Sequence, residues 1–67
     1  MIKMLYLCPR CREFVLETTH CGVRTILAGR VIDGEPHLTG RHMRTWSPAE
    51  REKIKDRLIN QYGGENA

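Results

Sequence analysis

The chain has 67 residues, a net charge of +3, and only one Trp and one Phe. A chain of this length buries only about 60% of its unfolded surface, so we expect one domain whose core needs a metal, disulfides or a partner. No apolar run approaches the roughly 20 residues that cross a bilayer, and residues 1–10 lack the long apolar region and cleavage site of a signal peptide. We therefore expect a cytoplasmic protein with reduced thiols and no membrane partner.

The first two thirds of the chain predict short strands. Residues 2–7 and 12–18 are rich in apolar and β-prone residues, and 23–32 form a third extended segment in which Gly29 marks a bend or bulge. The Asp-Gly pair at 33–34 is typical of a type I′ turn between antiparallel strands. Residues 37–45 either return as a hairpin strand or remain a loop.

The C-terminal segment predicts an amphipathic helix. Ser47 is the expected N-cap, Pro48 takes the first helical position, and Glu50 completes a capping box. Gly63 and Gly64 are expected to end the helix. Apolar residues recur along one face, which we expect to pack on the domain: Ile54, Leu58, Ile59 and Tyr62.

Three cysteines carry the clearest chemical signal, in the spacing C-x2-C-x9-C: Cys8, Cys11 and Cys21. A Cys-Pro-x-Cys turn brings two thiolates to one side of a tight loop, which is half of a tetrahedral zinc site. The odd number of cysteines leaves a disulfide scheme incomplete, and a redox CxxC pair normally opens a helix, which this stretch does not predict. We therefore expect one structural Zn²⁺ whose binding contributes to folding.

The fourth zinc ligand must be a histidine or a molecule from outside the chain. His20 adjoins Cys21 and is the first choice, although consecutive side chains of an extended strand point to opposite faces. His37 and His42, further along the chain, are the alternatives. If water took the fourth position, the zinc could activate that water for catalysis. We expect instead a site closed by four protein ligands, which is not catalytic.

The organisation predicted from these patterns is a small α+β zinc ribbon. It has three or four short antiparallel strands and a C-terminal amphipathic helix at about 47–62. We expect residues 1–64 to form the domain and residues 65–67 to form a disordered tail.

Residues of the cysteine segment and of the step before the helix match a known family pattern: Cys8, Pro9, Cys11, Phe14, Leu16, Cys21, Gly22, Thr25 and Ala28, with "WSPAE" at 46–50. On these residues the chain resembles the smallest core protein of archaeal box H/ACA ribonucleoproteins. It departs from that family at Thr18, which stands in place of a cysteine, at 29–45, which replace a short linker, and in the composition of the helix. The resemblance implies a scaffold that braces a pseudouridine synthase on guide RNA.

Arginines supply the candidate recognition surface, two on the first knuckle and four in the middle stretch: Arg10, Arg12, Arg24, Arg30, Arg41 and Arg44. Guanidinium groups suit bidentate contacts to phosphate. We expect a module without enzymatic activity or a small-molecule substrate that binds RNA or DNA, within a ribonucleoprotein or transcription complex. The alternative is a protein-binding adaptor or inhibitor of a transcription or RNA-processing machine. Trp46 is available for base stacking, but its place before the N-cap favours packing.

Overall fold

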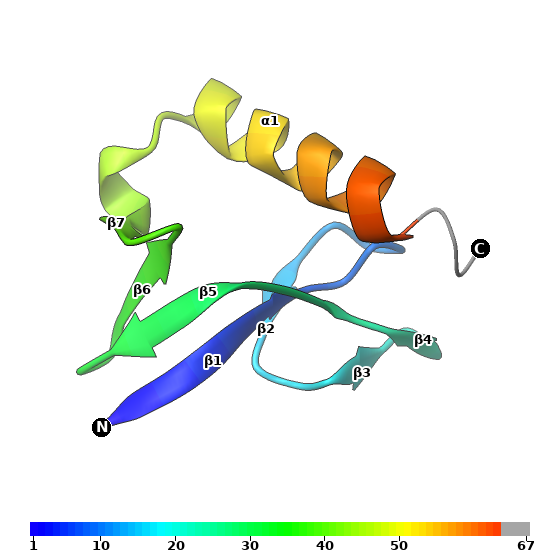
Figure 1. The fold of residues 1–67 in the computed structure, drawn as a ribbon, viewed down its shortest axis with the longest axis horizontal. Helices are drawn as coiled ribbons and strands as arrows, with labels where there is room; N and C mark the ends of the chain where they lie inside the picture. The colour runs from blue at the N-terminus through cyan, green and yellow to red at the C-terminus, as the bar shows by residue number, and fades with distance from the viewer. Residues whose placement is uncertain (64–67) are drawn as a thin grey trace.

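The computed structural model describes residues 1–63, and its centre is a five-stranded antiparallel sheet (Figure 1). The strand order in this sheet is β2-β1-β5-β6-β7, with bounds β2 Phe14–Val15, β1 Ile2–Leu7, β5 Ile26–Ile32, β6 Glu35–Leu38 and β7 Arg41–His42. A separate two-stranded sheet pairs β3 (Thr19–His20) with β4 (Val23–Arg24). The β3–β4 hairpin lies at one end of the molecule, and β6 and β7 lie at the other (Figure 1).

After β7, a 3-10 turn at Met43–Thr45 leads to the helix α1 (Pro48–Leu58), which continues as a π-helical turn at Ile59–Gly63. The predicted α+β class, with antiparallel strands and one C-terminal helix, is confirmed. The stop at Gly64 and the tail at 65–67 lie outside the described residues. Within residues 1–63, neither helical segment is long and apolar enough to cross a membrane.

The predicted strand at 12–18 is divided into two short pieces. Phe14 and Val15 pair with β1, and pairing resumes only at Thr19 in the second sheet. A straight strand of seven residues would carry its end about 20 Å from its start, away from the first two cysteines. The division lets the chain turn back, so that Cys21 returns to the loop that holds Cys8.

The hairpin between β5 and β6 has the predicted turn. Asp33 has a φ of 51° and Gly34 a φ of 79°, the two left-handed residues of a type I′ turn. The irregularity predicted at Gly29 is a bulge against β1: Leu5 lies opposite Gly29 and Tyr6 opposite Leu27. Ala28 is therefore the extra residue.

Gly29 also fixes how closely β5 approaches β6. A Cβ atom at this position would overlap the carbonyl oxygen of His37, which is backbone and cannot rotate away as a side chain could. We expect Gly29→Ala to lower the free energy of unfolding by about 2 kcal/mol or more in urea titrations. The exposed neighbour Leu27 provides the control, since Leu27→Ala should change that free energy by less than about 0.5 kcal/mol. Equal midpoints for the two variants would contradict the close approach.

The helix α1 covers one face of the sheet (Figure 1), and the core lies between them. The buried side chains of this core come from β1, β5, β6 and α1: Leu5, Leu7, Ala28, Leu38 and Ile54. Trp46 is half-buried against this cluster, so its predicted packing role is confirmed. Leu58 and Ile59 also pack on the core, but Tyr62 is 51% exposed, so the apolar stripe ends earlier than predicted.

The start of α1 has the predicted capping box. The backbone N–H of Glu50 donates to the Ser47 hydroxyl at 3.2 Å, and the backbone N–H of Ser47 donates to the Glu50 carboxylate at 2.9 Å. This second bond lowers the pKa of Glu50 below its ordinary value. Both bonds satisfy N–H groups that the first helical turn would otherwise leave unpaired.

Candidate metal centre

Four side chains converge where the loop after β1 meets the turn between β3 and β4: Cys8, Cys11, His20 and Cys21. Their ligand atoms all lie within 4.8 Å of one another. Nδ1 of His20 lies 3.4 Å from Sγ of Cys11 and 3.3 Å from Sγ of Cys21. Ligand atoms around a tetrahedral zinc, with Zn–S of about 2.3 Å and Zn–N of about 2.0 Å, are roughly 3.5 Å apart. Three thiols and one imidazole at this spacing therefore fit a zinc ion.

The first two cysteines are held by a tight backbone loop. The N–H of Cys8 donates to the carbonyl of Glu13 at 2.9 Å, and the N–H of Arg12 donates to the carbonyl of Cys8, also at 2.9 Å. Arg12 has a φ of 62°, which turns the chain back toward β2. Cys8 is fully buried at the end of β1, whereas Cys11 is exposed.

His20 and Cys21 reach the same point because the chain leaves the extended conformation between them. His20 is the last residue of β3, but Cys21 has a φ of 53° and Gly22 a φ of 74°. Two successive left-handed residues redirect the Cys21 side chain, so the alternation of a strand no longer separates the two ligands. The guanidinium of Arg10 joins the two turns by donating to the carbonyl of Cys21 at 3.3 Å.

The thiols of this cluster differ in acidity. Burial raises the pKa of Cys8, but hydrogen bonds from the backbone of Cys11, from the His20 side chain and from the backbone of Arg10 outweigh it and lower that pKa to about 6. The pKa of Cys21 is raised to about 11, first by its hydrogen bond with Cys11, then by desolvation and by its bond with Cys8. Three adjacent thiols cannot all ionise without a cation, which is the charge that Zn²⁺ supplies.

The two alternative ligands lie elsewhere, on the hairpin of β6 and β7. The rings of His37 and His42 are in tilted contact, with centroids 4.0 Å apart and an angle of 47° between the ring planes. Nδ1 of His37 is 2.9 Å from the carbonyl oxygen of Glu35, and Nδ1 of His42 is 3.6 Å from its carboxylate. Among residues 1–63, the structure therefore places His20, and neither alternative, with the three cysteines.

Arg12, predicted to bind phosphate, is in contact with α1. Its guanidinium lies 2.9 Å from the carboxylate of Glu52 and 2.8 Å from that of Asp56. These hydrogen bonds, that to Glu52 first, raise the pKa of Arg12 above its ordinary value. The contact connects the cysteine loop to the helix, and no local sequence pattern indicates this role.

Two further arginines are also near carboxylates. Arg41 lies 3.5 Å from the carboxylate of Glu50 and 4.8 Å from the ring centre of Trp46. Arg44 lies 3.9 Å from the carboxylate of Glu35.

The remaining predicted arginines are exposed and have no carboxylate partner within residues 1–63: Arg10, Arg24 and Arg30. They lie on different elements, the cysteine loop, β4 and β5. Of the six predicted arginines, these three have no carboxylate partner in the described residues, and the other three lie near carboxylates.

The four clustered side chains can hold a metal ion, with three sulfur donors and one nitrogen donor that suit zinc better than a hard, oxygen-preferring cation. Comparison of the chain with protein-family models, with curated proteins and with solved structures finds no match.

Proposed function

We propose that the chain is a non-catalytic zinc-ribbon module in which one Zn²⁺ has a structural role. The observation that supports this proposal is the donor set of Cys8, Cys11, His20 and Cys21. Three thiolates and one imidazole complete a tetrahedral shell, which leaves no position for a reacting water or substrate. Bound zinc would join the end of β1 to the β3–β4 turn and thereby stabilise the fold.

As the partner of this module we propose a nucleic acid. Support comes from the net charge of +3 and from the exposed guanidinium groups of Arg10, Arg24 and Arg30, which no carboxylate neutralises in the described part of the chain. These are three of the six arginines predicted from the sequence to bind nucleic acid. The resemblance of the cysteine segment to a ribonucleoprotein component supports a setting in a ribonucleoprotein, and a transcription complex is the other setting that we consider.

The test is the salt dependence of binding. Zinc-loaded protein is titrated into fluorescently labelled single-stranded and duplex RNA and DNA, at about 50 mM and about 200 mM salt. Three phosphate contacts on a single strand predict an affinity roughly 20-fold lower at the higher salt concentration, because counterions are released on binding. Absence of saturable binding to all of these oligonucleotides would overturn the nucleic-acid proposal and leave the zinc module standing.

The second candidate function is a protein-binding adaptor. It is favoured by exposed apolar side chains on β1 and β5: Ile2 is 59% exposed, Met4 39% and Leu27 52%. An interface built on these side chains would be mostly apolar, so its affinity would change little between the same two salt concentrations. A partner protein bound in that manner, and lost on Leu27→Ser, is the result that this candidate predicts.

A further inference from the structure

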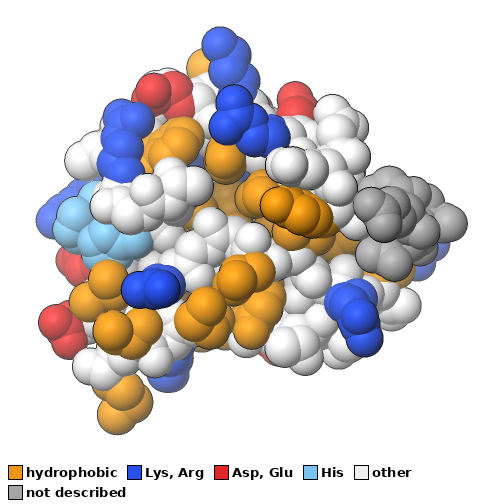
Figure 2. Space-filling model, viewed as in Figure 1, with side chains coloured by type: hydrophobic (Ala, Val, Ile, Leu, Met, Phe, Trp, Pro, Cys, Tyr) orange, Lys and Arg blue, Asp and Glu red, His pale blue; other side chains and the backbone are white. Residues whose placement is uncertain are grey.

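The face of the five-stranded sheet turned away from α1 carries a row of side chains that crosses four strands. Met4 on β1 lies opposite Arg30 on β5, Arg30 lies opposite His37 on β6, and His37 lies opposite His42 on β7. Directly opposed residues of antiparallel strands lie on the same face. In Figure 2, hydrophobic side chains gather beside the histidines with a basic side chain among them.

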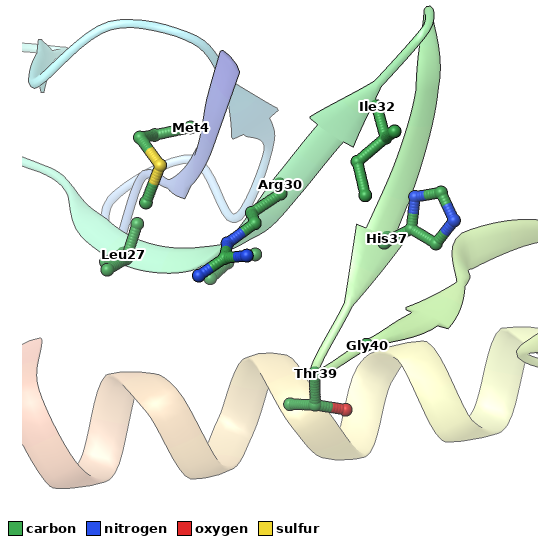
Figure 3. Close-up of a pocket in the computed structure, with 9 residues that line it drawn as sticks. Met4, Leu27, Arg30, Ile32, His37, Thr39 and Gly40 are labelled. Atoms are coloured by element: carbon green, nitrogen blue, oxygen red, sulfur yellow. The ribbon is translucent and has the colours of Figure 1, made fainter. Parts of the chain in front are cut away.

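An open groove of about 520 Å³ lies along this row. Met4 and Leu27 lie on one side of Arg30, and Ile32 and His37 lie on the other (Figure 3). The residues that line the groove include no Asp or Glu, and within residues 1–63 Arg30 has no carboxylate partner. The groove therefore combines apolar walls with one uncompensated positive charge.

The imidazole of His37 is held in place at one side of the groove. Its Nδ1 must donate to the carbonyl oxygen of Glu35, 2.9 Å away, because a carbonyl oxygen can only accept. The ring of His42 contacts it from β7, with centroids 4.0 Å apart and the two ring planes tilted by 47°. A ring fixed in this way loses little conformational freedom when another flat group stacks on it.

We propose that this groove binds a single-stranded segment of nucleic acid. A base would stack on the planar groups of Arg30 and His37, between the apolar walls, and a phosphate would bind the guanidinium. Single strands are favoured over duplexes because base faces are accessible only where bases are unpaired. A second copy of this chain fits less well, since a twofold contact over the groove would bring two Arg30 guanidinium groups together. This inference rests on the proposed nucleic-acid function and names its site.

The experiment measures binding of zinc-loaded protein to labelled 12-nucleotide oligo(dT) and oligo(rU), and to a duplex of the same length. Arg30→Gln is the test variant, and Arg57→Gln is the matched control, because Arg57 is exposed on α1 and its loss changes the net charge equally. We expect Arg30→Gln to weaken single-strand binding about tenfold or more and to reduce the salt slope by about 0.7. Arg57→Gln should stay within about twofold of the wild type, and the duplex should bind more weakly than either single strand.

Comparison of the two single strands identifies the natural ligand, since a contact to the 2′-hydroxyl would favour oligo(rU). Amide chemical-shift mapping of the wild type provides a second measurement that does not depend on a variant. At saturation, the shifts should be largest at Met4, Leu27, Arg30 and His37.

Three outcomes would overturn the assignment of binding to the groove while leaving the proposed function intact. They are equal losses of affinity in the two variants, equal affinity for duplex and single strand, and chemical-shift changes confined to the cysteine loop. A wild type that binds no oligonucleotide would overturn both. Self-association in sedimentation experiments that is abolished by Leu27→Ser, without oligonucleotide binding, would assign the groove to a second copy of the chain. A salt-insensitive protein partner at the groove would likewise overturn the inference.

Discussion

Removal of zinc with a chelator is expected to unfold the chain. The fully buried core side chains are few, and the β3–β4 hairpin forms a separate sheet whose turn brings Cys21 to the candidate metal ligands Cys8 and Cys11. Structural zinc contributes about 10–16 kcal/mol of apparent binding free energy in small zinc peptides, which equals or exceeds the roughly 5–15 kcal/mol stability of a typical domain. Circular dichroism and amide chemical-shift dispersion would follow the loss, and added Zn²⁺ should restore both.

Magnesium provides the control for this experiment, because it prefers oxygen ligands and should not restore the fold. A cooperative thermal transition that persists in excess chelator would contradict the structural role of the metal.

Zinc binding is also expected to depend on pH. With a pKa of about 11, Cys21 holds its proton at neutral pH and must release it when zinc binds, whereas Cys8, with a pKa of about 6, has mostly released its own.

The apparent zinc affinity should therefore fall as the pH falls, and more steeply below pH 6, where Cys8 is protonated as well. Calorimetry in two buffers of different ionisation enthalpy would measure the protons released per zinc. A zinc affinity that does not change between pH 7 and pH 5 would show that these thiols are not the ligands.

Substitution of His20 is expected to have the second largest effect. His20→Ala should lower the zinc affinity by more than about a hundredfold, because losing a ligand costs more than losing a supporting partner, which costs about 10–100-fold. His20→Cys should retain zinc, since a thiolate can replace the imidazole. Competition with a chromophoric chelator measures the affinity, and native mass spectrometry gives the zinc content.

His37→Ala and His42→Ala are the matched controls, and both should bind zinc as the wild type does. Their rings contact each other on β6 and β7, and neither belongs to the cysteine cluster. A loss of zinc in either variant equal to the loss in His20→Ala would overturn the assignment of the fourth ligand.

Features set by neighbouring residues could be predicted from the sequence. The capping box of Ser47 and Glu50 needs only the first helical turn, and the Asp33–Gly34 turn needs only two residues that accept a positive φ. The set of four candidate metal ligands also followed from the cysteine spacing and the adjacent histidine. The alternation of side chains along a strand argued against His20 as a ligand beside Cys21. It was a poor guide because Cys21 has a positive φ, and a cysteine does not by its residue type predict that conformation.

Features set by distant residues could not be predicted in this way. Arg12 is 40 residues from Glu52, and only the folded chain brings their charges together. The sequence likewise did not show that residues 1–63 leave one face of β1 and β5 exposed, because both faces of β1 carry apolar residues such as Met4 and Leu5. Charge counts along the chain therefore did not show which arginines lie near carboxylates.

The strand β5 separates two tasks along its length. Ile26, at its beginning, pairs with the end of β1 beside the metal centre, whereas Arg30 and Ile32, toward its end, line the groove. Substitutions around the groove can therefore accumulate in related proteins without disturbing the candidate metal ligands. Within such a lineage, the cysteine segment would diverge slowly while the second half of β5 and the β6–β7 hairpin record changes of partner.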